Sequence, residues 1–264
     1  MNILHTIAER TKERIEAQKK ILPQAKITEM AYPNTKSYFP FEKALKSEDM
    51  AFICEIKKAS PSKGIISEDF PYLDIAKDYE AAGVAAISVL TEPFYFMGSD
   101  QYLQEIANTV NIPLLRKDFT VDSYMIYEAK LLGASAVLLI CSILNRNILA
   151  EYIHISYNLG LSALVEVHDE AEVAMALSCG ARIIGVNNRN LKTFEVDITL
   201  SERLRKLVPP NVLFVSESGI SSPKDICKLQ EIKADAVLIG ESIMRSADKK
   251  AEINRLRGYK HGEN

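Results

Sequence analysis

One short stretch decides how this chain folds and where its chemistry lies, Cys54-Glu55-Ile56-Lys57-Lys58-Ala59-Ser60-Pro61-Ser62-Lys63-Gly64. Its first half has the apolar character of a strand, and its second half has the Ser, Pro and Gly of a turn. Because side chains alternate between the two faces of a strand, Glu55 and Lys57 share one face. Cys54 lies on the other, where we expect a buried packing thiol. An acid and a base on an inward face are costly to bury and are typical of the mouth of a catalytic site.

The same kind of strand recurs along the chain. From residue 50 onward, short apolar runs alternate with longer amphipathic runs, and Gly, Pro, Asn or Asp separate them. Strands are predicted over 52–57, 85–90, 114–117, 136–141, 162–167, 183–187, 212–216 and 236–239. Helical patterns between them, such as 73–82 and 123–132, supply the crossovers that parallel strands require. Because no glycine-rich nucleotide fingerprint is present, this alternation predicts an α/β protein with a (β/α)8 TIM barrel rather than an open sheet.

Several predicted helices carry capping signals at their ends. Asp169 is expected to cap the helix that follows it, with Glu172 as its reciprocal partner. Gly83, Gly133 and Gly180 each follow an amphipathic run and precede a strand. A left-handed residue that ends a helix costs least there when it has no Cβ.

Residues 1–49 precede the first predicted strand. Their apolar spacing indicates one or two helices and rests on Ile3, Ile7, Ile15, Ile21 and Leu22. Pro33 and Pro40 are expected to interrupt any helix there. We therefore expect a helical N-terminal extension over 1–49 and a single catalytic barrel over 50–264. The extension either caps the floor or side of the barrel or covers the substrate.

The composition excludes several classes of protein. With 47% hydrophobic and 25% charged residues and a formal net charge of −3, the chain has no broad attraction to nucleic acid or to an anionic membrane. Its first residues lack the apolar core of a signal peptide, and the apolar run over 136–141 is too short to span a bilayer. The four cysteines are too far apart for a zinc or disulfide framework, which predicts reduced thiols, a cytoplasmic location and no metal site.

Polar residues gather at the predicted carboxyl ends of the strands, where barrel enzymes carry their chemistry. They are Glu55, Lys57, Lys117, Glu166, Asn187, Arg189, Glu217 and Ser218. Any one of these side chains, taken alone, more often caps a strand or pairs with a surface neighbour. Apolar residues flank them, which indicates strands buried on both faces and favours one common site.

The last two strand ends carry small residues instead, over 218–221 and 240–243. Backbone N–H groups exposed there, followed by a short helix, form the usual phosphate site of this fold. Gly219 and Gly240 are therefore expected to bind a phosphate, with Lys57 and Arg189 adding positive charge. Glu241 would repel the phosphate unless its side chain points away. The alternative is a pair of ordinary glycine turns.

Taken in order, these segments resemble the indole-3-glycerol-phosphate synthase family over nearly the whole chain, including the helical extension. The motifs are Glu55-Ile56-Lys57-Lys58-Ala59-Ser60-Pro61-Ser62-Lys63-Gly64, Leu90-Thr91-Glu92, Phe96-Met97-Gly98-Ser99, Leu115-Arg116-Lys117-Asp118-Phe119, Val165-Glu166-Val167-His168-Asp169-Glu170, Ile184-Gly185-Val186-Asn187-Asn188-Arg189-Asn190-Leu191, Ser216-Glu217-Ser218-Gly219-Ile220 and Gly240-Glu241-Ser242-Ile243-Met244. The resemblance implies a carboxy-lyase of tryptophan biosynthesis. Such an enzyme closes the ring of 1-(2-carboxyphenylamino)-1-deoxyribulose 5-phosphate, with loss of CO₂ and water, to give indole-3-glycerol phosphate. It implies no metal and no redox cofactor.

The resemblance also implies catalytic roles. Lys117 is the general acid that protonates the ketone oxygen, and we expect a low-dielectric mouth with neighbouring cations to lower its pKa. Glu55, paired with Lys117 or Lys57, would oppose that shift. Glu166 is the expected base for the later dehydration, and Lys57 is the second candidate acid. How the family divides the dehydration among its lysines stays open at this point.

Binding roles follow from the same resemblance. Asn187 is expected to hydrogen-bond the developing hydroxyl, and Phe96 and Phe119 offer apolar walls for the aryl ring. The ends of the substrate are expected to meet Ser60, Arg189, Glu217, Ser218, Gly219, Gly240 and Glu241. His168 is expected to stabilise its own loop rather than to act in acid–base chemistry.

Two other functions compete with this interpretation. A sugar-phosphate isomerase would share the fold and the anion site, but it would need a cysteine base near the first strand end, and Cys54 faces the wrong way. A barrel that binds a phosphorylated ligand without turnover would have no use for Lys57, Lys117 and Glu166 together. We therefore expect an enzyme with a small phosphorylated substrate, acting as a monomer.

Overall fold

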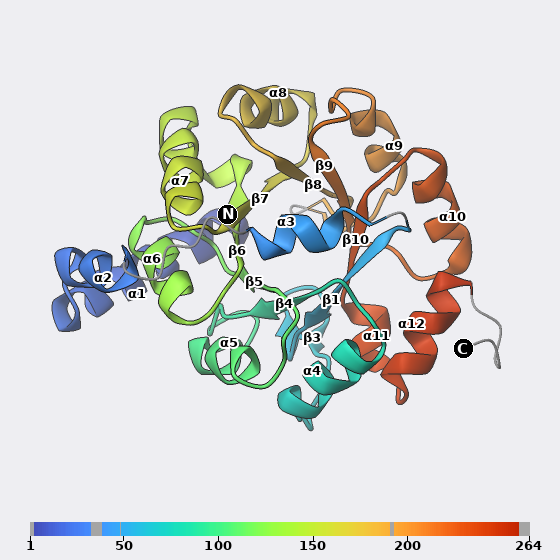
Figure 1. The fold of residues 1–264 in the computed structure, drawn as a ribbon, viewed down its shortest axis with the longest axis horizontal. Helices are drawn as coiled ribbons and strands as arrows, with labels where there is room; N and C mark the ends of the chain where they lie inside the picture. The colour runs from blue at the N-terminus through green and yellow to red at the C-terminus, as the bar shows by residue number, and fades with distance from the viewer. Residues whose placement is uncertain (1–2, 33–38, 48, 191–192, 259–264) are drawn as a thin grey trace.

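The computed structural model describes residues 3–32, 39–47, 49–190 and 193–258. Parallel strands close into a barrel, and helices surround it (Figure 1). The strands are β1 (Ala51–Ile56), β4 (Ala86–Leu90), β5 (Leu114–Lys117), β6 (Ala136–Ile140), β7 (Ser162–Val167), β8 (Ile183–Asn187), β9 (Leu213–Glu217) and β10 (Ala236–Ile239). Their order around the barrel is β1-β10-β9-β8-β7-β6-β5-β4, so the first and last strands are neighbours. The predicted (β/α)8 barrel is confirmed.

The predicted strand boundaries differ from the observed ones by small shifts at a few ends. β1 runs from Ala51 to Ile56, so Lys57 follows the strand instead of ending it. β9 runs one residue further than predicted, because Glu217 pairs in register with Asn187 of β8. β6 ends before Cys141, which begins a 3-10 turn. These shifts leave every inward-facing residue on its predicted face.

Helices cover the outside of the barrel. They are α4 (Tyr72–Ala81), α5 (Asp100–Ala107), α6 (Tyr124–Leu131), α7 (Arg146–Asn158), α8 (Glu170–Ser178), α9 (Thr199–Arg205), α10 (Pro223–Glu231), α11 (Glu241–Arg245) and α12 (Lys249–Arg257). The predicted left-handed glycines after α4, α6 and α8 are confirmed, with φ of 67°, 89° and 84°. Asp169 does cap α8 by accepting from the backbone N–H of Glu172. The reciprocal half of that prediction is wrong, because the Glu172 carboxylate accepts from the backbone N–H of His168 instead.

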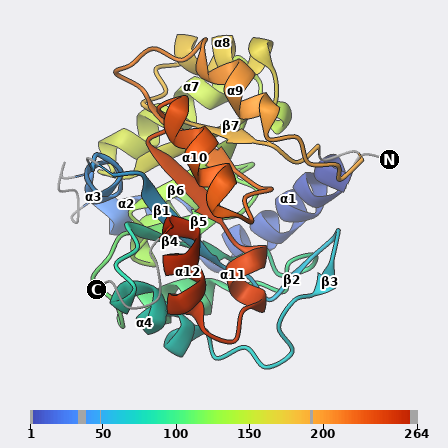
Figure 2. The same ribbon diagram turned by 90° about the vertical axis from the view of Figure 1, so that its right-hand side faces the viewer.

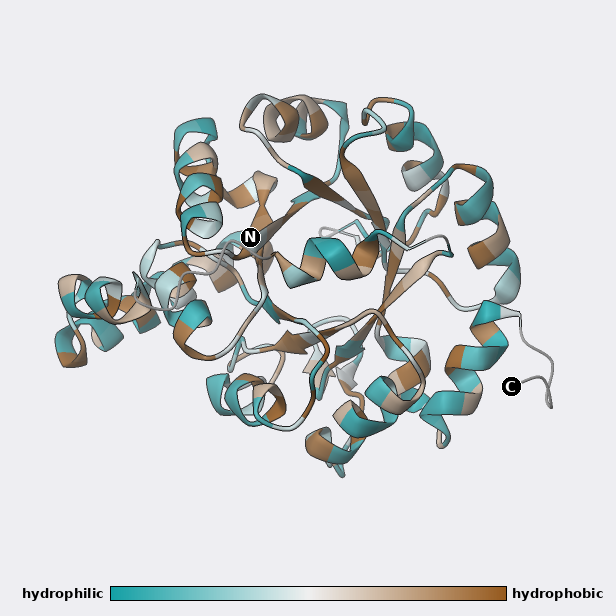
Figure 3. Cartoon of the chain, in the orientation of Figure 1, coloured by the Kyte–Doolittle hydropathy of each residue, from teal (hydrophilic) through white to brown (hydrophobic). Residues whose placement is uncertain are grey.

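Two apolar layers hold the barrel together. The outer layer lies between the strands and the helices and includes the fully buried Cys54, as its position in the strand predicts. The inner layer fills the barrel with side chains such as Leu115, Leu164 and Val215. Figure 3 shows the strands as the most hydrophobic part of the chain, with hydrophilic residues on the outward faces of the helices. The charged groups inside the barrel therefore lie at the ends of the strands, whereas Ser88 in the middle of β4 is a buried polar residue.

The segment before β1 forms α1 (Ile3–Ile21), α2 (Gln24–Ala31) and α3 (Pro40–Leu45), more helices than predicted. Pro40 is the first residue of α3, a position without need of an N–H, so it starts a helix and does not interrupt one. Pro33 lies outside the described residues. The view in Figure 1 looks onto α3, which lies across one end of the barrel, and Phe41 and Leu45 join the inner core.

The start of α1 lies at the opposite end of the barrel from α3 (Figure 2). The hairpin of β2 (Ala59–Ser60) and β3 (Gly64–Ile65), which follows β1 directly, lies at that same end. The helical extension therefore reaches both the floor and the mouth of the barrel. Within the described ranges, no helix has both the length and the apolar character needed to cross a membrane.

Candidate active site

A cavity of about 500 Å³ opens at the carboxyl ends of the strands. Every candidate residue of the sequence analysis lines it, namely Glu55, Lys57, Ser60, Phe96, Lys117, Phe119, Glu166, Asn187, Arg189, Glu217, Ser218, Gly219, Gly240 and Glu241. Most of them end or directly follow a barrel strand, whereas Ser60 lies in β2 and Phe96 lies in the loop after β4. The set is thus one site and not a series of separate surface caps.

Lys117 occupies the centre of this site. Its ammonium donates to Glu166 Oε2 at 3.1 Å and to Glu217 Oε2 at 3.0 Å, and both carboxylates are almost fully buried. Glu55 pairs instead with Lys57, which follows it on the same face of β1. The alternative that Glu55 pairs directly with Lys117 is not observed.

The surroundings of Lys117 are anionic, and the expected shift of its pKa is wrong in direction. Burial alone would lower the pKa of Lys117, but the charges of Glu166, Glu217 and Glu55 raise it well above its usual value. The expected lowering rested on neighbouring cations, but Lys57, the other lysine of the site, is paired with Glu55. The side chain of Lys117 is therefore protonated at neutral pH before the reaction begins.

The two carboxylates on Lys117 differ in their own acidity. Burial opposes ionisation of Glu166, but the charge of Lys117 and the contact with His168 outweigh it and hold the pKa of Glu166 well below its usual value. Burial dominates at Glu217 and raises its pKa to about 7, with Lys117 offsetting only part of the effect. One carboxylate is thus an ionised acceptor while the other can carry a proton near neutrality, a separation that suits acid–base work.

Asn187 and His168 hold the second oxygen of Glu166. Asn187 Nδ2 donates to Glu166 Oε1 at 3.3 Å, and its own Oδ1 accepts from the backbone N–H of Arg189. His168 Nε2 lies 3.4 Å from the same Oε1. The amide of Asn187 is therefore already engaged within the site, in addition to facing the cavity where substrate would lie.

One wall of the cavity is apolar. The rings of Phe96 and Phe119 lie 6.1 Å apart with a tilt of 40°. Ile3, Leu4 and Ile7 of α1 line the cavity as well, and the sequence analysis missed them as site residues. Their helical spacing was visible, but spacing alone does not say which end of the barrel the helix covers.

The opposite end of the cavity carries the small residues and several cations. Ser218 and Gly219 both have positive φ, 69° and 81°, which turns the chain sharply after β9. Glu241 does not stand free there, because its carboxylate lies near three cations: Lys63 at 3.4 Å, Arg245 at 3.4 Å and Arg189 at 3.8 Å. These contacts offset the charge of Glu241. Arg245 is a further lining residue that the sequence analysis missed, since it lies inside α11 and not at a strand end.

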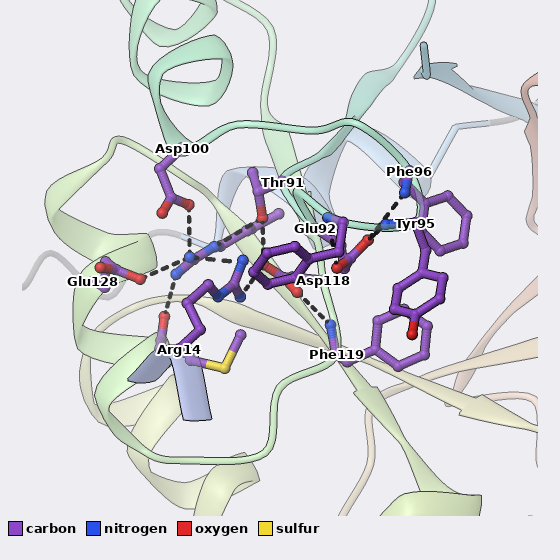
Figure 4. Close-up of polar contacts among 12 residues, drawn as sticks. Arg14, Thr91, Glu92, Tyr95, Phe96, Asp100, Asp118, Phe119 and Glu128 are labelled. Carbon is purple, nitrogen blue, oxygen red and sulfur yellow. Dashed lines mark hydrogen bonds and ion pairs between the residues drawn. The ribbon is translucent and has the colours of Figure 1, made fainter. Parts of the chain in front are cut away.

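A buried polar network supports the loop that carries Lys117 and Phe119 (Figure 4). Asp118 accepts from Arg14 of α1, from Thr91 Oγ1 and from the backbone N–H of Phe119, each at 2.8 Å. The same arginine thus ties the N-terminal extension to the loop after β5. Asp118 therefore stays ionised, with its pKa below the usual value because these partners outweigh its burial.

Glu92 performs a similar task for the loop that carries Phe96. It is fully buried, and its carboxylate accepts from the backbone N–H groups of Phe94, Tyr95 and Phe96 at 3.0, 2.7 and 3.0 Å. Figure 4 shows this carboxylate directed at the backbone of the loop that carries Tyr95 and Phe96. In the described part of the chain, no group of His, Cys, Asp and Glu residues is arranged to hold a metal ion.

Comparison with known proteins identifies the family. A sequence model described as indole-3-glycerol phosphate synthase matches residues 4–256. The chain is also 62% identical over 257 residues to the indole-3-glycerol phosphate synthase of Ruminiclostridium cellulolyticum, which covers 97% of this chain and 99% of that protein. The chain belongs to the indole-3-glycerol phosphate synthase family.

Other members of the indole-3-glycerol phosphate synthase family also share about half of their residues with this chain. The protein of that name from Lachnoclostridium phytofermentans is 51% identical over 267 residues, covering 97% of this chain and 98% of that protein. Among solved structures, 3-hexulose-6-phosphate synthase from Salmonella typhimurium matches with a TM-score of 0.65 at 15% identity, over 79% of this chain and 97% of that one. That likeness shows the barrel fold alone.

This member of the indole-3-glycerol phosphate synthase family needs a glycine at 185 to seat Glu217. A Cβ on Gly185 would lie 2.2 Å from Glu217 Oε1 and 3.1 Å from a methyl group of Leu164. We expect Gly185→Ala to displace the Glu217 carboxylate and to lower kcat by about tenfold or more, since sub-ångström placement of catalytic groups matters to this extent. Steady-state kinetics measure the effect.

Gly180→Ala is the matched control. Gly180 has a φ of 84° but no atom within 4 Å of an added Cβ. That variant should lose about 1 kcal/mol of stability from backbone strain and keep its kcat. If both variants lose stability and neither loses activity, the glycine at 185 serves packing and not the placement of Glu217.

Proposed function

We propose that the chain converts 1-(2-carboxyphenylamino)-1-deoxyribulose 5-phosphate to indole-3-glycerol phosphate, with loss of CO₂ and water. The observation that carries this proposal is the position of Lys117, held by two buried carboxylates between an apolar wall and an end rich in cations and glycine. Membership of the family supports the same reaction. This reaction would make the protein a carboxy-lyase of tryptophan biosynthesis.

Ring closure begins with attack of the aryl carbon that bears the carboxylate on the ketone carbon. The C=O π bond opens as the new C–C bond forms, and Lys117 donates a proton to the oxygen, which leaves a hydroxyl on the substrate and a neutral lysine until the lysine is reprotonated. Because the pKa of Lys117 is raised, its main contribution is a fixed positive charge at the developing oxyanion. Glu217, 3.0 Å away and with a pKa of about 7, can return the proton to the lysine.

Dehydration follows the loss of CO₂. The ring carbon or nitrogen must give up a proton while the hydroxyl leaves as water, so a base and an acid act on the same intermediate. Glu166 is the base, because it is ionised at neutral pH and Asn187 fixes its orientation. Lys57 serves as the second acid, and its pairing with Glu55 keeps it on the inward face.

The two ends of the cavity hold the two ends of the substrate. The aryl ring packs between Phe96, Phe119 and the first turns of α1, while the phosphate binds at Gly219 and Gly240 beside Arg189. Ser60 and Ser218 supply the remaining polar contacts. Fixing both ends brings the ketone of a flexible chain against the ring carbon, which is a large part of the catalytic effect of such sites.

The direct test is a turnover assay. Purified protein is mixed with the carboxyphenylamino-deoxyribulose phosphate, and the formation of the indole is followed by its absorbance or fluorescence. We expect indole-3-glycerol phosphate and one equivalent of CO₂. Well-folded protein that forms no indole would overturn the proposal, and isomerised substrate without CO₂ would favour a sugar-phosphate isomerase in its place.

Inorganic phosphate tests the anion end of the cavity. We expect phosphate to compete with the substrate, and Arg189→Gln to raise both KM and the inhibition constant of phosphate by about tenfold, as loss of a charged hydrogen bond predicts. Arg203→Gln on α9 is the control, because that arginine is exposed and pairs only with Glu170 in the described structure. Noncompetitive inhibition, or equal effects of both substitutions, would contradict this assignment.

The organisation of the chain and its location are part of the same proposal. Residues 1–49 act as a helical extension that completes the site of the catalytic barrel over 50–264. The cysteines that the structure describes are unpaired, which suits the reducing cytoplasm. The enzyme acts as a monomer on a small phosphorylated substrate.

A further inference from the structure

His168 touches Glu166 from the side that faces away from the cavity. Its Nε2 lies 3.4 Å from Glu166 Oε1, and its side chain is only 19% exposed. Glu166, Asn187 and Lys117 line the cavity, but His168 does not. A group in this position acts on substrate only through Glu166.

A second carboxylate holds the other ring nitrogen. Glu172 Oε2 lies 3.1 Å from His168 Nδ1 and accepts from the backbone N–H of the same residue at 2.7 Å. Glu172 is itself fixed, because its backbone N–H is bound by the N-cap residue Asp169. The imidazole therefore bridges a carboxylate of the site and a carboxylate of α8.

The groups around the imidazole favour its charged form. Glu166 of β7 and Glu172 of α8 face its two nitrogens, Lys117 lies beyond Glu166, and Asp169 follows in the chain. The thiol of Cys141, packed against α8, is uncharged because burial raises its pKa. Burial opposes protonation of His168, but the carboxylates of Glu166 and Glu172 beside its two nitrogens raise its pKa to about 10.

The negative charge of the site explains why a protonated histidine lies beside Glu166. Three buried carboxylates at the strand ends, Glu55, Glu166 and Glu217, face only two lysines, Lys57 and Lys117. An imidazolium between Glu166 and Glu172 places a positive charge beside Oε1 of Glu166 without lining the cavity. Oε2 of Glu166 accepts from Lys117, while Oε1 accepts from Asn187 and lies 3.4 Å from His168 Nε2.

We propose that His168 is a positioning residue that keeps the Glu166 carboxylate ionised and correctly oriented, and that Glu172 holds the imidazole in place for this task. The inference rests on the proposed role of Glu166 as the base. It assigns to His168 more than the stabilisation of its own loop that the sequence predicts. His168 is not a catalytic residue, since it does not reach the substrate.

The kinetic test compares His168→Gln with the native enzyme over pH. Without the imidazolium, Glu166 takes up a proton more readily, so the acidic limb of the kcat/KM profile should move upward by about one pH unit. At the optimum, kcat should fall by about tenfold, and KM should change less than twofold. His154→Gln, which removes an exposed histidine of α7, should leave the profile unchanged.

Two further variants separate the inference from the proposed function. Glu166→Gln should be nearly inactive. Full activity of that variant would show that Glu166 is not the base, which would contradict the proposed function independently of any result for His168. If Glu166→Gln is inactive while His168→Gln keeps the native pH profile, only the present inference fails. Glu172→Gln should reproduce part of the His168→Gln shift, because the imidazole loses its second partner.

Nitrogen-15 NMR of the histidine rings tests the inference without a change at His168. In the intact protein we expect the His168 ring to remain an imidazolium at pH 8, and to lose its proton near neutral pH in Glu172→Gln. A native His168 that is already neutral at pH 7 would overturn the inference. Because this measurement uses the intact protein, it tests the protonation of His168 even if the substitution of His168 prevents folding.

Discussion

Lys117→Met should lower kcat by about a thousandfold or more while changing KM far less. The substitution removes the group at the centre of the site that is proposed to protonate the ketone oxygen and to offset its developing charge, interactions that matter chiefly in the transition state. It also leaves Glu166 and Glu217 buried without their shared cation, so both carboxyls should take up protons and stability at neutral pH should fall. Steady-state kinetics and urea unfolding measure the two effects separately.

Lys77→Met is the matched control for this experiment. Lys77 lies on α4, pairs only with Asp74 in the described structure and has a largely exposed side chain. It should retain native kcat and native stability. Normal turnover by Lys117→Met would mean that another group protonates the ketone, and Lys57 would then be the remaining candidate.

Arg116→Met should reduce the free energy of unfolding by about 3–5 kcal/mol, the usual cost of removing one partner from a buried ion pair. Arg116 is 2% exposed and faces away from the cavity, opposite in parity to Lys117. Its guanidinium donates to Asp100 at 2.6 Å, to Glu128 at 2.7 Å and to the Met125 carbonyl at 2.9 Å (Figure 4). The side chains of Asp100 and Glu128 are 27% and 15% exposed, so water can replace these contacts only in part once the guanidinium is gone.

The measurement is urea unfolding at neutral pH, with Arg203→Met on exposed α9 as the control that should change stability by less than about 0.5 kcal/mol. Arg116→Lys should recover part of the loss, since an ammonium cannot reach all these acceptors at once. Equal stability of Arg116→Met and native protein would show that Asp100 and Glu128 do not depend on this cation.

The barrel was predictable because its strands are buried on both faces. Each strand appears as a short apolar run, and the glycines after the helices mark where each unit ends. The errors in the predicted strand boundaries lie at strand ends, where hydrogen bonding to the neighbouring strand decides which residue is the last. Glu217 belongs to β9 because it pairs with Asn187 across the sheet, and a single strand read alone cannot reveal such a partner.

The membership of the site was also predictable, but its pairing was not. Parity and strand position bring Lys117, Glu166 and Glu217 to one opening, as the structure has them. Which carboxylate meets which cation depends on the stagger of strands far apart in sequence. The shift in the pKa of Lys117 depends on those pairings. Its direction therefore could not be predicted from the residues adjacent to Lys117 in the sequence.

The N-terminal segment was the least predictable part. Its apolar spacing indicates helices, but Pro40 was read as an interruption although it begins α3. The contribution of Ile3, Leu4 and Ile7 to the cavity depends on where α1 docks. That docking uses the ion pair between Arg14 and Asp118, two residues whose connection no local pattern reveals.

The pairing of β1 with both β4 and β10 has a consequence for synthesis on the ribosome. A nascent chain that has emerged as far as β9 still presents an unpaired edge on β1, and Glu55 and Lys57 lie beside that edge without their neighbour Gly240. The ring can close only after the last strand leaves the exit tunnel. The site is therefore completed only at the end of translation, and until then two strand edges stay open, those of β1 and β9, which both pair with β10 in the finished barrel.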